Sequence, residues 1–132
     1  MDNSIMTGNY LLEVLNDPEN GLVEILGENK IFPLVAKEDT LYPFIIYTRD
    51  SLNVQYTKIV GHDNMVNITY RVYSDNYDQT VAIANKIRNI LERKTINIDG
   101  IIKINDLRIV GMQELYNDDG FCQILSFQTY VE

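Results

Sequence analysis

The chain has 132 residues, of which 45% are hydrophobic and 23% charged, with seven glycines and three prolines. This length and balance are typical of a folded domain and not of a disordered segment, so we expect residues 1–132 to form a single domain. The 19 acidic residues outnumber the 11 basic ones and give a net charge of −8. A field of that sign repels phosphate backbones, which disfavours specific nucleic-acid binding.

The sequence lacks the usual signals for export or membrane insertion. Cys122 is the single cysteine and cannot form an internal disulfide, so nothing indicates an oxidising compartment. Residues 1–10 have neither the basic nor the apolar region of a signal peptide. No apolar run approaches the roughly 18 residues of a membrane-spanning helix. We therefore expect a protein of a reducing cytoplasm, without a membrane segment.

The N-terminal third predicts two short helices and a brief strand. Apolar residues spaced through residues 4–16 indicate an amphipathic helix that stops at Asp17-Pro18. Residues 21–27 indicate a second short helix or turn that ends at Gly27. Residues 30–34 predict an edge strand, because Pro33 cannot donate a hydrogen bond to a central ladder.

Two strands are predicted on either side of a polar segment. Residues 42–48 are rich in aromatic and β-branched side chains, which favours a buried strand. Residues 49–64 are polar and predict a long loop or a protruding hairpin. Residues 65–73 alternate strictly, which is typical of a half-buried strand. The residues predicted to share its buried face are Val66, Ile68, Tyr70 and Val72.

One long helix is predicted at about residues 76–93. Ser74 and Asp75 are candidate N-caps, and Asp78 places negative charge in the first turn. The residues predicted for its apolar face are Tyr77, Val81, Ala84, Ile87 and Leu91. The basic residues near its end are Lys86, Arg88, Arg93 and Lys94. Their spacing places most of them on the solvent face, so we do not interpret them as a nucleic-acid site.

The C-terminal third predicts strands at residues 98–104, 107–116 and 121–131, with a hairpin turn at residues 117–120. The last strand has apolar side chains on both faces, as expected where helices cover one face and the other is partly covered. The order of elements indicates an α+β fold. We expect a mainly antiparallel sheet, with the long helix at about 76–93 and the short N-terminal helices packed on one face.

No residue pattern predicts a catalytic, cofactor or metal site. His62 is the only histidine and lies in a turn, and Cys122 lies in a predicted strand, where a small buried hydrophobe is the usual role. Asp118 and Asp119 lack the ligand spacing of a calcium loop, so hairpin-turn chemistry explains them better. The glycines match no phosphate-binding motif. We therefore predict a protein that is not an enzyme.

The tyrosines allow two interpretations. Those in or beside the predicted strands and the polar segment are Tyr42, Tyr47, Tyr56, Tyr70, Tyr73, Tyr116 and Tyr130. Cross-strand packing is the simpler interpretation, and a surface for assembly with other proteins is the functional one.

From Ile31 onward the sequence resembles a family of small phage proteins: the tail-completion, tail-terminator and head-to-tail joining (neck) proteins of tailed bacteriophages. Residues 31–33 lead into residues 41–47, similar to the family's "lPyvvy" strand, and residues 67–74 resemble its "v.v.vws" strand. A helix follows directly, and residues 120–130 resemble the family's "g.yr.sldf.vw" ending. Tyr73 in place of the commoner tryptophan and the long segment 49–64 depart from the family pattern.

The resemblance implies a structural virion protein that assembles in the host cytoplasm and forms a closed ring, commonly of six copies, at the head–tail junction. Its expected partners are its own copies, the capsid connector and tail-tube proteins, with genome DNA passing through an acidic lumen and no membrane or cofactor involved. The loops at residues 36–40 and 49–64 are candidate contacts to neighbouring ring proteins. The candidate residues are Lys37, Glu38, Asp39, Tyr56, Lys58, His62 and Asp63.

A second hypothesis is a small cytoplasmic binding or regulatory module. In such a protein an exposed strand edge or a tyrosine-rich face would take up a peptide or a protein partner.

Overall fold

The computed structural model describes residues 4–53, 64–98, 102–117 and 120–131. Its helices are α1 (Thr7–Leu15), α2 (Leu22–Leu26) and α3 (Tyr77–Leu91), with 3-10 turns at Ser4–Met6 and Pro18–Asn20. Its strands are β1 (Ile31–Pro33), β2 (Phe44–Asn53), β3 (Asn64–Ser74), β4 (Ile96–Ile98), β5 (Ile102–Asn117) and β6 (Gly120–Val131). The fold is α+β, as predicted.

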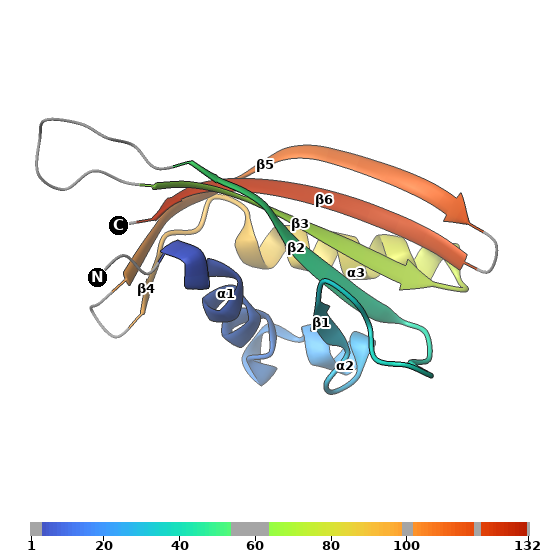
Figure 1. The fold of residues 1–132 in the computed structure, drawn as a ribbon. Coiled ribbons are helices and arrows are strands. Elements are labelled where there is room, and N and C mark those ends of the chain that lie inside the picture. Colours follow the sequence, from blue (N-terminus) through green and yellow to red (C-terminus); the bar gives the residue numbers. More distant parts are fainter. Residues whose placement is uncertain (1–3, 54–63, 99–101, 118–119, 132) are drawn as a thin grey trace, which may run out of the picture.

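The strands form a curled six-stranded sheet in the order β1-β2-β3-β6-β5-β4, with the helices on one face (Figure 1). The prediction of a mainly antiparallel sheet is right in part. The ladders β2–β3, β3–β6, β5–β6 and β4–β5 are antiparallel, but β1 runs parallel to β2, so the sheet is mixed. Helix α3 connects β3 to β4, and the β4–β5–β6 meander returns β6 to the side of β3.

The N-terminal segment forms the two short helices that the sequence predicts. In α1, Leu11 and Leu15 lie one helical turn apart and are fully buried. The Asp17 side chain accepts a hydrogen bond of 3.0 Å from the Glu19 amide and starts the next turn. Gly21 then adopts a left-handed conformation with φ of 82°, which glycine allows without steric cost, and α2 follows.

Helix α3 lies within the predicted range but is shorter than residues 76–93. Its N-cap is Asn76, whose side-chain oxygen accepts a 3.1 Å hydrogen bond from the Gln79 amide. The prediction of Ser74 or Asp75 as the cap is therefore wrong. The Ser74 hydroxyl instead accepts a 3.1 Å hydrogen bond from the Asn76 amide. The helix ends at Leu91 because the Glu92 backbone is extended.

The core lies between the sheet and the helix layer. The predicted buried face of β3 is confirmed, since each of its four apolar side chains is at most 1% exposed. On the neighbouring strand β6, Leu125, Phe127 and Val131 face the same core. The Tyr70 and Phe127 rings pack edge to face with 5.9 Å between their centroids.

The buried side of α3 differs from the predicted one. Ala84, Ile87 and Leu91 are buried, as predicted, but Tyr77 and Val81 are 43% and 42% exposed. Thr80 and Ile83 take the buried positions instead, and both are fully covered. The α3 helix is therefore rotated relative to the apolar stripe that the sequence predicts.

Two predicted boundaries are corrected by strand pairing. Residues Arg49–Asn53 belong to β2 and pair with β3, so the loop interpretation is wrong for them and the hairpin interpretation is right. Residues 54–63 lie outside the described part of the chain. The predicted strand 98–104 is divided: Ile98 ends β4, residues 99–101 lie outside the described part of the chain, and residues 102–104 begin β5. β5 also contains the predicted strand 107–116, because β6 pairs with it on both sides of Asn105-Asp106. A register irregularity between Asn105 and Arg108 absorbs the polar interruption.

Two strand glycines offer a stability test with its own control. A Cβ at Gly120 would lie 2.7 Å from the Tyr42 hydroxyl and 3.0 Å from the Ser74 carbonyl oxygen. We expect Gly120→Ala to lower the free energy of unfolding by about 1–2 kcal/mol, because this crowding forces the neighbours apart. Gly111 has nothing within 4 Å of a built Cβ. Gly111→Ala should therefore be neutral or slightly stabilising. Denaturant unfolding of both variants checks this, and equal effects would contradict it.

Candidate functional site

The structure places the predicted contact residues of one loop and not of the other. Lys37, Glu38 and Asp39 follow β1, and all three are exposed. The other four candidates, Tyr56, Lys58, His62 and Asp63, lie outside the described residues. Because these three side chains are exposed, the loop is accessible to a partner.

The tyrosines divide between the two interpretations. Tyr47 and Tyr70 are 7% and 1% exposed and pack in the core, which is the cross-strand role. The ring of Phe44 stacks on the rings of both Tyr42 and Tyr73, with centroid separations of 5.6 and 5.1 Å. The tyrosines available to a partner are Tyr77, Tyr116 and Tyr130, which are 43%, 69% and 44% exposed. Tyr56 lies outside the described residues.

Of the residues considered for catalysis or metal binding, the structure describes Cys122, whereas His62, Asp118 and Asp119 lie outside the described residues. Cys122 is buried, as predicted for a small hydrophobe, and burial raises the pKa of its thiol. No group of three or more histidine, cysteine or acidic residues is close enough to hold a metal ion among the residues described. Within the same residues, no helix has the length and apolar character needed to cross a membrane.

The basic residues near the end of α3 do not form a free positive patch. Arg88 pairs with Glu92 at 2.7 Å, and Arg93 pairs with Asp106 at 2.7 Å. Arg108 also contacts Asp106, at 2.9 Å. Hydrogen bonding from Arg108 holds the pKa of the Asp106 carboxyl below its usual value, with the charge of Arg93 adding to the effect. These carboxylates offset the positive charge locally.

One side of β5 is an open sheet edge, here called the β5 edge and defined as the outer side of residues Arg108–Asn117. β4 covers only Ile102–Ile104, and the Leu107 amide donates to the Lys94 carbonyl at 2.9 Å. From Arg108 onward, this side of β5 pairs with no strand in the part of the chain that the structure describes. Alternate backbone N–H and C=O groups therefore face outward without a ladder partner.

A groove runs between the β5 edge and α3. It consists of two adjoining depressions of about 280 and 340 Å³ that share Gln123 in their lining. The exposed apolar side chains around it are Tyr77 and Val81 of α3 and Met112 and Tyr116 of β5. Phe121 contacts both tyrosine rings, with centroid separations of 5.6 Å to Tyr77 and 4.9 Å to Tyr116. We call this surface the α3–β5 groove.

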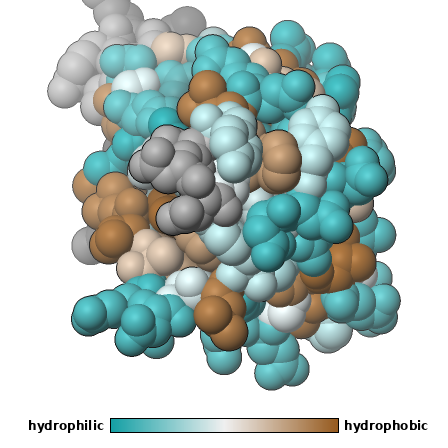
Figure 2. Space-filling model, turned by 90° about the vertical axis from the view of Figure 1, so that its right-hand side faces the viewer, coloured by the Kyte–Doolittle hydropathy of each residue, from teal (hydrophilic) through white to brown (hydrophobic). Residues whose placement is uncertain are grey.

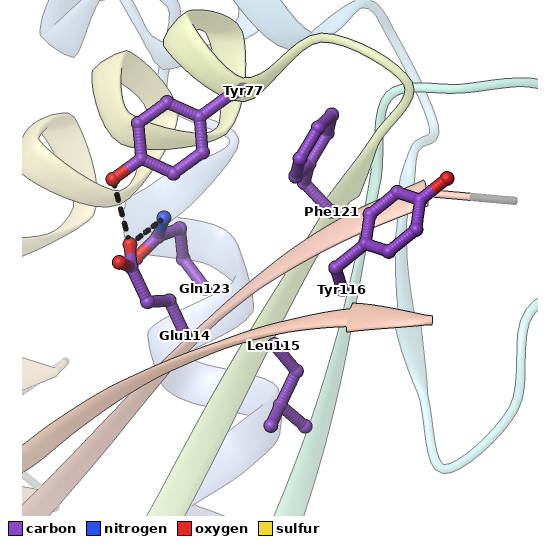
Figure 3. A pocket seen from close by; sticks show the side chains of 6 residues that line it. All are labelled: Tyr77, Glu114, Leu115, Tyr116, Phe121 and Gln123. Atoms are coloured by element: carbon purple, nitrogen blue, oxygen red, sulfur yellow. Dashed lines mark hydrogen bonds between the residues drawn. The ribbon is translucent and has the colours of Figure 1, made fainter. Parts of the chain in front are cut away.

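Glu114 is the charged centre of this groove (Figure 3). Its carboxylate accepts hydrogen bonds from the Tyr77 hydroxyl at 2.8 Å and from the Gln123 side-chain nitrogen at 3.0 Å. These bonds, with that from Gln123 the larger, hold the pKa of Glu114 below its usual value. The hydrogen bond between Tyr77 and Glu114 also raises the pKa of the Tyr77 hydroxyl. Leu115 points to the opposite face of β5, so the strand presents apolar side chains on both faces.

Removal of the Tyr77 hydroxyl tests this network. We expect Tyr77→Phe to raise the pKa of Glu114 toward its ordinary value, because the carboxylate loses one of its two donors. A carboxyl-carbon NMR titration measures the change. Tyr116→Phe is the control, since no hydrogen bond joins Tyr116 to Glu114 in the described structure. An unchanged Glu114 pKa in Tyr77→Phe would show that the hydroxyl does not bind it in solution.

A second exposed apolar surface follows β1, at the opposite edge of the sheet from the β5 side. Leu34, Val35 and Leu41 are 74%, 73% and 77% exposed, and together they are called the Leu34 patch. Leu34 also has a φ of 65°, a left-handed backbone that is rare for a bulky side chain.

Figure 2 looks onto the end of the molecule where β5 meets β6 and shows separate hydrophobic patches divided by hydrophilic side chains.

Sequence reasoning missed both surfaces. The sequence pattern predicts ordinary strand residues at residues 107–116 and an edge strand at residues 30–34, and it indicates no apolar surface at either place. A usable signal was present at the β5 edge: residues 110–117 contain no lysine, arginine or proline, the residues that usually protect exposed edges.

The geometry defines an α+β domain with an open sheet edge, and the comparisons with known proteins bear on that fold. No family model matches the sequence, and no curated protein does. Among solved structures, the chain is similar to one from a structure titled "Virion of native gene transfer agent (GTA) particle". The TM-score is 0.71 at 12% sequence identity, and the match covers 92% of this chain and 91% of that one. At this identity the likeness shows a shared fold.

Proposed function

We propose that this protein is a structural component of a phage or phage-like particle and works by assembly, without catalysis. The observation that carries the proposal is the likeness of fold to a chain of a gene transfer agent virion over nearly the whole length of both chains. The sequence resemblance to neck and tail-completion proteins, which rests on strand and helix patterns in the same order along the chain, points to the same class.

Within that class, the proposed place is the head–tail junction, as a closed ring that joins the capsid connector to the tail. A closed ring requires two different surfaces on each copy, because its contacts are heterologous. The β5 edge and the Leu34 patch lie on opposite sides of the sheet, which fits the requirement of two separate surfaces. The net charge of −8 fits a lumen along which DNA slides without adhering.

The test is deletion of the gene from the genome that carries it, followed by electron microscopy of the particles. We expect DNA-filled heads and separate tails, with joining restored by the wild-type gene supplied on a plasmid. A labelled copy of the protein should also be found at the neck of intact particles. Normally joined, infectious particles from the deletion strain would refute the junction role, and absence of the label from particles would refute the virion role.

The alternative is a small protein-binding module, and the open β5 edge beside the α3–β5 groove is the observation that favours it. An extended peptide could add to this edge as a further strand and place alternate side chains in the groove. A stable 1:1 complex with one host protein, together with absence of the protein from particles, would favour this function over the structural one.

A further inference from the structure

We infer that the end of the α3–β5 groove beside Glu114 holds a lysine or arginine side chain from an extended segment of a partner protein, and that the backbone of this segment pairs with the β5 edge. The inference deepens the proposed function by naming the chemistry of a partner, and it rests on that function only in requiring a protein partner. Its basis is the set of side chains in the groove.

Three aromatic rings line this end of the groove, a depression of about 280 Å³ (Figure 3). The Phe121 ring contacts the other two, with centroid separations of 5.6 Å to Tyr77 and 4.9 Å to Tyr116. Tyr77 and Tyr116 are 43% and 69% exposed, so part of each is open to a ligand. The electron-rich faces of aromatic rings attract ammonium and guanidinium groups. The depression therefore suits a cation carried on an apolar stem.

The Glu114 carboxylate has an acceptor left for that cation. Its hydrogen bonds from the Tyr77 hydroxyl and the Gln123 side-chain nitrogen both end on Oε2. Oε1 accepts no hydrogen bond from the residues that the structure describes. Both donors are neutral, and no described lysine or arginine forms a salt bridge with Glu114. The carboxylate can therefore accept a charge-assisted hydrogen bond from a basic side chain of a partner.

The other charged groups leave the groove negative. Asp78 lines the second depression and forms no salt bridge among the described residues. Arg88 lines the same depression, but its guanidinium is bound to both carboxylate oxygens of Glu92, at 2.7 and 3.5 Å. One cation is thus set against the carboxylates of Asp78, Glu92 and Glu114. This balance favours a basic partner and disfavours an acidic one.

The β5 edge runs beside both depressions, which suits an extended partner. β5 contributes Glu114 and Tyr116 to the first depression and Met112 to the second. Side chains on one face of an extended chain recur every two residues, about 7 Å apart. From Val110 to Tyr116 every residue of β5 is exposed, and the register with β6 is regular from Gly111 onward. A segment paired with this edge therefore places two side chains, two residues apart, in adjoining depressions.

The segment that fits has a defined pattern. A lysine or arginine occupies the aromatic depression, because its methylene stem packs on the rings while its charged end reaches Glu114. The residue two positions away is aliphatic and packs on Val81 and Met112, which are 42% and 45% exposed. Burial of these apolar side chains adds to the contact.

Synthetic peptides test this recognition on the full chain. The probes are blocked heptapeptides of sequence Thr-Val-Thr-X-Thr-Val-Thr, in which X is lysine, arginine, norleucine or glutamate and the two valines allow either strand direction. Amide chemical shifts of the ¹⁵N-labelled protein give an affinity for each probe. We expect the lysine and arginine peptides to bind about fivefold or more tightly than the norleucine peptide, which keeps the stem without the charge. The glutamate peptide should bind most weakly.

Variants of the protein separate charge from shape. Glu114→Gln keeps the size of the side chain without its charge, so the lysine and norleucine peptides should bind it within about twofold of each other. Tyr116→Leu removes one ring at an exposed position and should weaken binding of the lysine peptide by about threefold or more. Glu24→Gln is the matched control, since Glu24 is an exposed residue of α2 that lines neither depression. It should keep the wild-type ranking.

Nuclear Overhauser contacts locate the bound side chain. They should join the lysine methylene protons to the rings of Tyr77, Tyr116 and Phe121, and the peptide backbone to residues 110–116. Four peptides that cause no shifts at these residues, affinities without a preference for lysine and arginine, or a Glu114→Gln variant that keeps the preference would each overturn the inference. The proposed virion function is tested separately by the position of the protein in particles, so either idea can fail without the other.

Discussion

Truncation of Ile83 to alanine is expected to lower the free energy of unfolding by about 2–5 kcal/mol. Ile83 is fully buried on the side of α3 that faces the sheet, so its removal leaves a cavity between two layers that cannot close easily. The loss is a large part of the roughly 5–15 kcal/mol that holds a domain of this size folded. Urea unfolding followed by circular dichroism measures it.

Val81→Ala is the matched control for this prediction, because Val81 lies on the same helix and is 42% exposed. We expect a change within about 0.5 kcal/mol, since a surface substitution removes little packing and alanine favours the helix. The sequence pattern predicts the reverse ranking, because it assigns Val81 to the buried stripe. Comparable losses in the two variants would show that α3 sits on the sheet in a different rotation.

The rotation of α3 could not be read from periodicity because the helix has more apolar residues than one stripe holds. Val81, Ile83, Ala84, Ile87 and Ile90 spread over a wide arc, and several rows with helical spacing fit within it. The sheet decides which row is buried, and its position depends on pairing between strands far apart in the chain. The local pattern therefore predicts that a helix forms here, but not which of its sides is buried.

Strands with strict alternation were predicted well, and strands with polar interruptions were not. The buried row of β3 follows from its sequence, because a period of two leaves no freedom in the choice of face. β5 crosses Asn105-Asp106, which is locally a turn signal. The structure accommodates Asp106 at a φ of 45°, with its amide hydrogen-bonded to the Thr95 hydroxyl at 3.1 Å. Pairing with β6 on both sides outweighs the local preference.

The candidate surfaces could be predicted only in part. Lys37, Glu38 and Asp39 are exposed, as expected of a polar loop, and their contact with a partner stays a prediction. The β5 edge could not be found in the same way. Whether an apolar strand is central or at an edge depends on the strand order, which places β6 between β3 and β5 and leaves β5 covered only by the short β4.

Replacement of Tyr70 by phenylalanine is expected to raise the free energy of unfolding by about 1–3 kcal/mol. The Tyr70 side chain is 1% exposed and packs between Tyr47 and Phe127. Its hydroxyl is buried and has no hydrogen-bond partner among the residues described. An unpaired buried hydroxyl loses its bonds to water on folding without replacement, so phenylalanine keeps the ring contacts and removes that cost.

The pH dependence gives this prediction a second readout. Burial, with a smaller contribution from Tyr47, raises the pKa of Tyr70 well above its ordinary value of 10.0. Below that pH both the folded and the unfolded chain keep the proton. Above it only the unfolded chain ionises, so stability falls as the pH rises. Tyr70→Phe should therefore lose less stability than the wild type above pH 10.0.

Tyr130→Phe is the control for both measurements, because Tyr130 is 44% exposed and water can solvate its hydroxyl in either state. Its free energy of unfolding should change by less than about 0.5 kcal/mol. A Tyr70→Phe variant that is less stable than the wild type would mean that the hydroxyl has a partner in solution, such as a buried water molecule. In that case the Tyr70 ring and hydroxyl would both stabilise the sheet, and the core beneath β3 would be polar at its centre.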